Sequence, residues 1–406
     1  MSDRRFIYTG NWASTYNERG NTAVCVYEYK ETDREWKRIQ RVPMEYSVSG
    51  LWVDTERYML YISLEISRFQ QEEPGGRVLW FKIDRETGML LPAGQINSFG
   101  AFPLDLKLSE HYALVLNHGS NRPPVCGVFA DRDGTIRTGN VFDAATLVLF
   151  ERDDEGNLTK ARDFYAFTGS GEIPFFQDTA SPHSLCRGMD RTEYLVPERG
   201  TDRVSIFRID GENWKISRQG EIRIPKGYGP RNAIAVQGLS SCYVIGEIMP
   251  AVLLCKESQG KLSPVQKLTT VPEKELEQYK EPVTSFQYPH PSALAVSPDH
   301  RFLYTLTRAA DVLAVYPLHP ETGEMGSPSC HRLSGANPRQ LLLEGGDLYI
   351  VFQDTETIER VRLNAITGTP VQEITVIRDI PRLAVMDMLV MQQEAGEAEN
   401  ETNYTR

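Results

Sequence analysis

The feature that most constrains the fold is a four-stranded unit that recurs along the chain. Its clearest copy covers residues 292–316 and ends in the turn Pro320-Glu321-Thr322-Gly323. It contains four short runs rich in β-branched and aromatic residues, with turn residues between them. Weaker copies end in similar turns at 85–88, 154–157, 210–212 and 366–368. A single unit of this kind cannot bury both faces of its sheet, so neighbouring units must pack against each other.

We count seven units, which begin near residues 6, 48, 103, 181, 230, 290 and 337. A four-stranded unit with a period of roughly 40 to 50 residues is typical of a β-propeller. The sequence therefore predicts an all-β fold, a single seven-bladed β-propeller over residues 1–391. The segment 381–386 is expected to pair with the first unit and close the ring, which removes the exposed sheet edges.

Two segments break the period of the repeat, and a third carries the best candidate for a helix. Residues 119–143 are rich in Gly, Pro, Asp and Asn and are interpreted as an insertion between two strands of the third unit. The insertion is either a surface loop or a lid over the channel mouth. Residues 272–279 predict a short polar helix of one or two turns. Residues 392–406 are polar, and we expect a disordered tail there.

Composition limits the class of partner. The 406 residues include 44 Lys and Arg against 55 Asp and Glu, a net charge of −11. Nucleic-acid binding usually needs a basic face, so this balance argues against it. No apolar run approaches the roughly 18 residues that span a bilayer, and the first residues lack a signal-peptide pattern. We therefore expect a soluble cytoplasmic protein that does not bind membranes.

The six cysteines are scattered and contain no Cys-x-x-Cys pair. In a cytoplasmic chain this pattern indicates reduced core residues rather than a disulfide or zinc framework. They are Cys25, Cys126, Cys186, Cys242, Cys255 and Cys330.

Four polar residues at strand ends are the main candidates for chemistry, because propellers commonly bind ligands on the loops at the mouth of the central channel. His183 and Arg231 each follow a proline near the start of a unit. Glu247 follows a strand of the fifth unit, and Arg308 lies at the same point of the sixth.

These residue types suit a reaction on an anionic carbonyl or ester substrate. An imidazole serves as general base near neutral pH. Two guanidinium groups hold a carboxylate, a phosphate or a developing oxyanion. A carboxylate orients these groups, or donates a proton if its pKa is raised. Structural alternatives remain open: His183 as a turn residue, Arg231 as a loop brace, and Glu247 with Arg308 as an ion pair.

Missing motifs disfavour a serine-nucleophile hydrolase, a nucleotidase and a zinc enzyme. The chain has no Gly-x-Ser-x-Gly elbow, no Walker loop and no cluster of His ligands. We therefore expect neither a metal nor a cofactor. Further polar residues near strand ends are candidates for substrate binding, with a solvated loop as the alternative: His118, Arg199, Arg339 and Gln353, followed by Glu65 and Glu198.

At these residues the chain resembles the seven-bladed propeller lactonases, which include 6-phosphogluconolactonases and carboxymuconate cyclases. The resemblance covers about residues 5–388. It implies that His183, Arg231, Glu247 and Arg308 form the active-site quartet. It rests on Gly169-Ser170-Gly171 through Gln177 to Pro182-His183-Ser184, on Gly229-Pro230-Arg231, on Glu247, and on Ser297-Pro298-Asp299 through Arg308.

The chain departs from the family pattern at several positions. Ser181 and Asn232 stand where the family usually has histidines, and Phe176 stands where it has an arginine. Ala309 and Ala310 replace more polar residues. These changes weaken the case for a phosphorylated sugar lactone in particular, while leaving the fold untouched.

Three functions follow as hypotheses. The first is a lactone hydrolase in which His183 activates water, Arg231 and Arg308 bind the anionic group and the oxyanion, and Glu247 orients or protonates. The second is a carboxymuconate-type lactonizing cyclase with Glu247 or His183 as proton donor. The third is a propeller that only binds a ligand or a protein partner.

Overall fold

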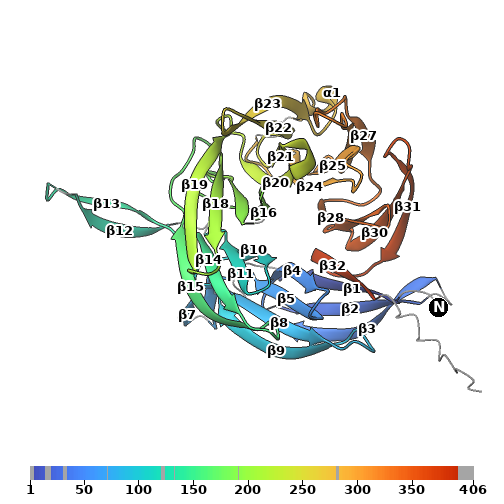
Figure 1. Ribbon diagram of the computed structural model, residues 1–406, viewed down its shortest axis with the longest axis horizontal. Helices are drawn as coiled ribbons and strands as arrows, with labels where there is room; N and C mark the ends of the chain where they lie inside the picture. Colours follow the sequence, from blue (N-terminus) through green and yellow to red (C-terminus); the bar gives the residue numbers. More distant parts are fainter. Residues whose placement is uncertain are drawn as a thin grey trace, which may run out of the picture.

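The molecule is a ring of seven four-stranded antiparallel sheets around a central axis (Figure 1). The computed structural model describes residues 4–13, 20–30, 34–70, 72–119, 124–131, 133–190, 192–279 and 283–391. The seven-bladed propeller predicted from the repeat is confirmed. Within the described residues, no helix is long and apolar enough to cross a membrane.

The blades follow one another along the chain, and all but the first run from the inner to the outer strand. Blade 1 contains β32 (Leu383–Met391), β1 (Arg4–Asn11), β2 (Thr22–Lys30) and β3 (Glu35–Met44). Blade 2 contains β4 (Val48–Asp54), β5 (Met59–Leu64), β8 (Arg77–Ile83) and β9 (Leu90–Asn97). Blade 3 contains β10 (Pro103–Leu108), β11 (Tyr112–Asn117), β14 (Thr146–Arg152) and β15 (Leu158–Ala166).

The remaining blades keep the same order. Blade 4 contains β16 (Cys186–Arg187), β17 (Glu193–Glu198), β18 (Arg203–Asp210) and β19 (Lys215–Arg223). Blade 5 contains β20 (Pro230–Val236), β21 (Ser241–Gly246), β22 (Ala251–Ser258) and β23 (Lys261–Thr269). Blade 6 contains β24 (His290–Val296), β25 (Phe302–Arg308), β26 (Val312–Pro317) and β27 (Ser329–Arg332). Blade 7 contains β28 (Pro338–Glu344), β29 (Asp347–Phe352), β30 (Thr357–Leu363) and β31 (Pro370–Ile377).

Blade 1 closes the ring with strands from both ends of the chain. The C-terminal strand β32 is its innermost strand and pairs antiparallel with β1 from Arg4↔Met391 to Asn11↔Leu383. The carboxylate of Asp387 on β32 accepts a hydrogen bond of 2.8 Å from the backbone N–H of Val53 in blade 2. The ring therefore closes through the strand that begins in segment 381–386, as the sequence predicted.

The hydrophobic core is divided among the seven junctions between neighbouring blades. Buried tyrosines join some of these junctions, because a phenol in a core needs a hydrogen-bond partner. Tyr8, Tyr61 and Tyr243 donate to the carbonyls of Gly88, Gly156 and Gly323, at 2.9, 2.5 and 2.6 Å. Each glycine lies in a turn of the next blade and has a positive φ, so the turns that mark the repeat also connect the blades.

Smaller elements lie outside the blades. The segment between β11 and β14 forms a hairpin of β12 (Val125–Ala130) and β13 (Ile136–Val141), which projects away from the ring (Figure 1). A second small hairpin joins β6 (Arg68–Phe69) and β7 (Glu73–Pro74). The predicted helix is a single turn, α1 (Glu273–Leu276), and a 3-10 turn spans Gln237–Leu239. The predicted tail, 392–406, lies outside the described residues.

The cysteines are all free, but not all belong to the core. Cys25, Cys186, Cys242 and Cys255 are buried, and Cys330 is half-buried. Cys126 is exposed on the β12–β13 hairpin, which corrects the expectation that the cysteines are core residues. An isolated two-stranded hairpin has no second layer to cover its side chains.

Candidate active site at the channel mouth

One irregularity recurs in every blade, near the start of its inner strand. Near the start of each inner strand the pairing register shifts by one residue, which leaves one residue unpaired as a bulge. In blade 4 the same shift lies between the bridge Pro182↔Glu198 and the pair Cys186↔Leu195. A bulge turns its extra residue away from the regular alternation of the strand. These bulge positions are Ser49, Leu104, His183, Arg231, Ser292, Arg339 and Ala384.

A second ring of positions lies beside the first. On the second strand of each blade, one residue pairs with the residue just before the bulge. The next residue along the chain is what we call the loop position. In six blades its N–H donates to the carbonyl two residues before the bulge, as Glu247 does to Gly229 at 2.6 Å. In blade 6 the corresponding residue, Arg308, pairs with His290. The loop positions are Trp12, Glu65, His118, Arg199, Glu247, Arg308 and Gln353.

The four predicted catalytic residues occupy these two rings in consecutive blades. His183 and Arg231 are bulge positions of blades 4 and 5, and Glu247 and Arg308 are loop positions of blades 5 and 6. Nearly all the predicted substrate-binding residues fall on the same rings. The spacing of the sequence repeat therefore brings them to one end of the channel.

Glu247 is the centre of the cluster. Its Oε1 accepts hydrogen bonds from Arg231 Nη1 at 2.7 Å and from Arg308 Nη2 at 2.8 Å. Its Oε2 accepts one from Arg199 Nη1 at 3.1 Å. Burial by itself raises the pKa of the Glu247 carboxyl, but the three guanidinium groups outweigh it and hold the pKa well below its usual range. Glu247 is therefore ionised and holds the arginines in place.

His183 lies against the same cluster. Its Nε2 is 2.5 Å from Arg231 Nη1, and its ring meets the ring of His118 edge-on at 5.4 Å between centroids. Burial, followed by the charge of Arg231, holds the pKa of His183 well below its usual value. The imidazole is therefore neutral, and its Nε2 accepts the guanidinium hydrogen bond.

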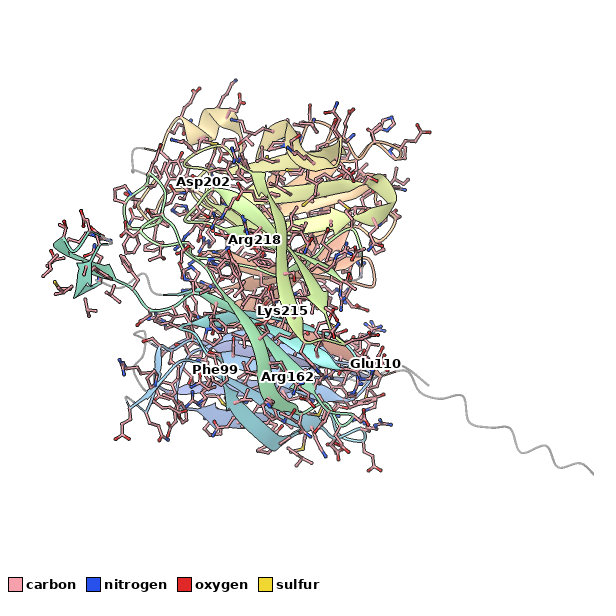
Figure 2. All side chains as sticks on the ribbon, turned by 60° about the vertical axis from the view of Figure 1, so that its left-hand side comes forward. Phe99, Glu110, Arg162, Asp202, Lys215 and Arg218 are labelled. Carbon is pink, nitrogen blue, oxygen red and sulfur yellow. The ribbon has the colours of Figure 1, made fainter. Side chains whose placement is uncertain are left out.

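Arg231 is fixed by several partners at once. Besides Glu247 and His183, its Nε donates to the carbonyl of Ser292 at 3.1 Å. Burial lowers the pKa of Arg231 to about 9, so the guanidinium remains charged at neutral pH. The backbone just before Arg231 is also fixed. Asp202 accepts hydrogen bonds from the N–H groups of Gly227 and Gly229 at 2.7 and 2.8 Å. Asp202 is labelled in Figure 2.

Local sequence explains why the bulge of blade 5 begins as it does. Gly229 has a φ of 63°, a backbone conformation that side chains rarely adopt. A Cβ at this position would lie 2.6 Å from Ile248 Cγ1. Glycine is thus required two residues before Arg231, and the following proline fixes φ at the start of the strand.

The structure places the other predicted residues in different surroundings. Arg339 donates to Gln353 at 3.0 Å and lies 3.8 Å above the ring of Trp12. His118 Nδ1 is 2.9 Å from the carbonyl of Gly119, and burial, then Arg199, lowers its pKa to about 3. His118 is therefore uncharged at neutral pH and lies beside His183 at the edge of the cluster.

Glu198 does not join the mouth. It is fully buried and accepts hydrogen bonds from Thr201 at 2.8 Å, from Arg203 Nε at 2.9 Å and from Ser205 at 2.5 Å. Its place facing the bulge of blade 4 turns its side chain into the blade rather than into the channel. Its full burial contradicts the solvated-loop alternative, and these hydrogen bonds give Glu198 a structural role within blade 4.

Two further residues support the quartet: His290, which sequence reasoning missed, and Gln177, which it quoted in the resemblance without a role. His290 Nδ1 lies 2.7 Å from the carbonyl of Glu247, and Nε2 lies 2.8 Å from the carbonyl of Ser285. Gln177 accepts from two backbone N–H groups at 3.0 Å and donates to the carbonyl of Arg199 at 2.9 Å. The Pro-His pair at 289–290, which repeats the pair before Ser184, was a signal available for His290.

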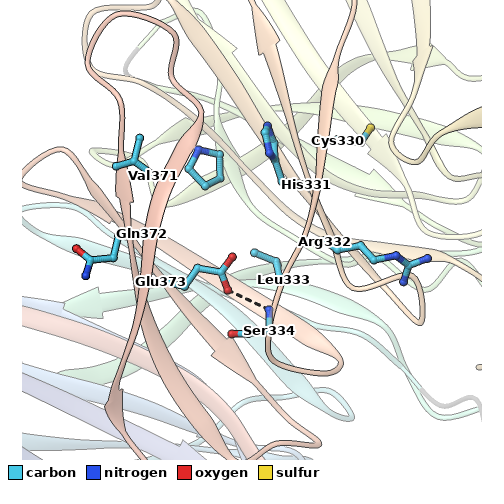
Figure 3. A pocket seen from close by; sticks show the side chains of 9 residues that line it. Cys330, His331, Arg332, Leu333, Ser334, Val371, Gln372 and Glu373 are labelled. Carbon is cyan, nitrogen blue, oxygen red and sulfur yellow. Dashed lines mark hydrogen bonds between the residues drawn. The ribbon is translucent and has the colours of Figure 1, made fainter.

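A separate groove lies on the outer side of the ring between β27 and β31 (Figure 3). It is lined by Cys330, His331 and Arg332 on one side and by Val371, Gln372 and Glu373 on the other. The Ser334 N–H donates to Glu373 at 2.9 Å across it. Within the described residues, neither this groove nor the channel mouth brings together three or more His, Cys, Asp or Glu side chains that could hold a metal ion.

Comparisons with known proteins show to which family the fold belongs. Residues 10–376 match the family described as "Lactonase, 7-bladed beta-propeller". A 6-phosphogluconolactonase of Formosa agariphila is 22% identical over 359 residues, which cover 87% of this chain and 91% of that protein. The structure of a periplasmic gluconolactonase of Pseudomonas aeruginosa has a TM-score of 0.77 at 19% identity, covering 96% of this chain and 100% of that one.

A putative 6-phosphogluconolactonase of Bacteroides fragilis is similar in fold as well. Its TM-score is 0.74 at 20% identity, over 95% of this chain and 98% of that one. At 19–20% identity the solved structures show only that the fold is shared. The family match, in contrast, spans most of the chain. The chain belongs to the seven-bladed β-propeller lactonase family.

Proposed function

We propose that the protein hydrolyses an anionic sugar lactone at the channel mouth. The observation that carries the proposal is the arginine cluster: Arg199, Arg231 and Arg308 converge on the single carboxylate of Glu247. Arg339 lies on the same ring of bulge positions as Arg231, and its charge acts on Arg231. Local positive charge in a chain of net charge −11 attracts an anionic ligand to this mouth.

The arginines supply the electrostatic part of the reaction. Arg231 and Arg308 each use one terminal nitrogen on Glu247 Oε1 and are held there in fixed positions. Guanidinium groups held in advance stabilise the oxyanion that forms when water attacks a lactone carbonyl. Arg339 and Gln353 are proposed to bind the polar end of the substrate further around the ring.

The roles predicted for His183 and Glu247 need adjustment. A neutral His183 can accept a proton, but its Nε2 already accepts a hydrogen bond from Arg231, so water must replace that bond first. Activation of water by His183 stays a prediction. Glu247 is ionised, so it orients the arginines and does not protonate the leaving group.

The cyclase hypothesis is less well supported by the same geometry. Lactonization of a diacid needs a proton donor, and neither the ionised Glu247 nor the neutral His183, whose pKa is low, suits that role at neutral pH. A propeller that only binds its ligand remains an outcome of the test below.

The test is hydrolysis of 6-phosphogluconolactone and of glucono-δ-lactone by the purified protein, with variants Arg308→Ala and His183→Ala. We expect turnover above the spontaneous rate and a loss of about 100-fold in kcat/KM for Arg308→Ala, as for removal of one oxyanion donor. The matched control is Arg203→Ala, which removes an arginine paired with Glu198 outside the mouth. Turnover at the spontaneous rate on both lactones would reject the proposal and favour a binding role.

We also propose that the reaction takes place in the cytoplasm. Cysteines that are all free support this. Cell fractionation with detection of the tagged protein tests it, and recovery from the periplasm or the medium would contradict it.

A further inference from the structure

Glu65 is a second carboxylate at the channel mouth, in the loop position of blade 2. Its N–H donates to the carbonyl of Ser47 at 2.9 Å, the same backbone bond that fixes Glu247 in blade 5. The two blades are three places apart in the ring of seven, so the two carboxylates stand on opposite sides of the channel. Because the positions are equivalent, a ligand in the mouth lies between them.

The surroundings of the two carboxylates differ sharply. Glu247 is held by three arginines, whereas Glu65 Oε2 is buried and has no hydrogen-bond partner among the described residues. The groups that act on Glu65 are the guanidinium groups of Arg339 and Arg231 and the indole of Trp12. Arg231 belongs to blade 5, so a charge from across the ring acts on Glu65.

A buried carboxyl oxygen without a partner needs an explanation. Leaving such a group unpaired costs folding free energy, and a catalytic role is one of the reasons for which native proteins keep such groups. Two carboxylates in one site with opposite environments are the usual arrangement for dividing the work between a fixed charge and a proton carrier. Glu247 already has the first of these roles.

We propose that Glu65, rather than His183, is the catalytic acid–base residue of the site, which rests on the lactonase function proposed above. The Glu65 carboxylate accepts a proton from water as the water oxygen bonds to the lactone carbonyl carbon. The resulting oxyanion is stabilised by Arg231 and Arg308. The bond from that carbon to the ring oxygen then breaks, and Glu65 returns its proton to the departing oxygen. The products are a hydroxyl group and a carboxylic acid, which releases its proton to solvent.

The ionisation of Glu65 suits this role. Burial raises the pKa of Glu65 to about 7, with Arg339, Arg231 and Trp12 opposing the rise. A general base is most effective when its pKa lies near the working pH. By comparison, the pKa of His183 is held well below its usual value and its Nε2 is occupied by Arg231.

The first test is the pH dependence of kcat/KM for the better lactone substrate. In the wild type we expect activity to rise with pH through a midpoint near 7, because the base must be ionised. Glu65→Gln should lower kcat about 100-fold with little change in KM and should abolish that midpoint. Glu65→Asp should restore part of the activity, whereas His183→Ala should keep the midpoint.

The second test needs no substrate. The infrared difference spectrum of wild type against Glu65→Gln should show a protonated carboxyl band that disappears with a midpoint near pH 7. A midpoint near the ordinary glutamate value, or an active Glu65→Gln enzyme with an unchanged pH profile, overturns this inference alone. A wild type that hydrolyses no lactone overturns it together with the proposed function.

Discussion

At the scale of single residues, the site depends on how burial and neighbouring charge act on carboxylates. Glu247 and Glu65 have equivalent backbone positions, yet the pKa of Glu247 is held low and that of Glu65 is raised to about 7. The difference is the presence of three arginines in contact with Glu247. Such contacts also link the site to stability, since a buried charge that loses its partner is costly.

We therefore expect Glu247→Gln to destabilise the fold by about 3 kcal/mol, because three largely buried guanidinium groups lose their counter-charge. Urea unfolding followed by tryptophan fluorescence measures the change. The control is Glu198→Gln, which removes a buried carboxylate paired with Arg203. Both variants should lose stability, but only Glu247→Gln should also lose activity. If Glu247→Gln were as stable as the wild type, burial of the three arginines would not depend on the charge of Glu247.

Glu65 should make the stability of the fold depend on pH. Its pKa is higher in the folded chain than the ordinary value of 4.5, so the folded state binds the proton more tightly than the unfolded state. Its contribution to stability is present below about pH 4.5 and is lost as pH rises through 7. Glu65→Gln should therefore raise the unfolding midpoint at pH 8 more than at pH 5. An equal change at both pH values would contradict a raised pKa.

At the scale of elements, the bulge near the start of each inner strand decides which side chains reach the channel. It leaves one residue out of register, and the N–H of the loop position then bonds two residues before the bulge. In blade 5 this geometry needs Gly229, whose carbonyl accepts from Glu247 and whose φ is 63°. One glycine therefore helps to position both Arg231 and Glu247.

Gly229→Ala should destabilise the fold by about 2 kcal/mol, because a Cβ meets Ile248 and the positive φ becomes strained. It should also lower kcat/KM about tenfold, since Arg231 and Glu247 are displaced together. The control is Gly220→Ala on β19, where an added Cβ meets nothing within 4 Å. Activity and thermal unfolding are compared for both. Equal behaviour of the two variants would count against the role of the bulge.

At the scale of the whole molecule, ring closure is the decisive event. The core is divided among seven junctions, and two of them include side chains of β32. The hairpin of β12 and β13 is attached outside this ring (Figure 1). The two segments should therefore differ greatly in their importance for folding.

A chain that ends at Arg382 lacks β32, so it should lose its cooperative thermal transition and expose the β1 edge of blade 1 and the face of blade 7 against which β32 packs. Replacing residues 124–142 by a short Gly-Ser linker should shift Tm by less than about 3 °C. Calorimetry of the two variants gives the comparison. A cooperative transition near the wild-type Tm in the chain without β32 would show that closure is dispensable.

The repeat along the chain is enough to predict the fold and the place of most candidate residues in it. Strand-forming runs and turn glycines are local signals, and their regular spacing could be satisfied only by packing unit against unit. The same spacing indicated that His183, Arg231, Glu247 and Arg308 occupy similar places in successive units. Equivalent positions in a closed ring must meet at the channel.

The contacts that each side chain makes there come from the tertiary structure. Burial and charge come from other blades, so sequence did not separate Glu198, which turns into its own blade, from Glu247, which meets three arginines. The supporting contact of His290 joins residues 43 positions apart. Burial inside the closed ring raises the pKa of Glu65, and two arginines from other blades, Arg339 and Arg231, oppose that rise. A pattern along the chain fixes position around the ring, whereas the electrostatic state of a residue depends on neighbours that only the closed ring supplies.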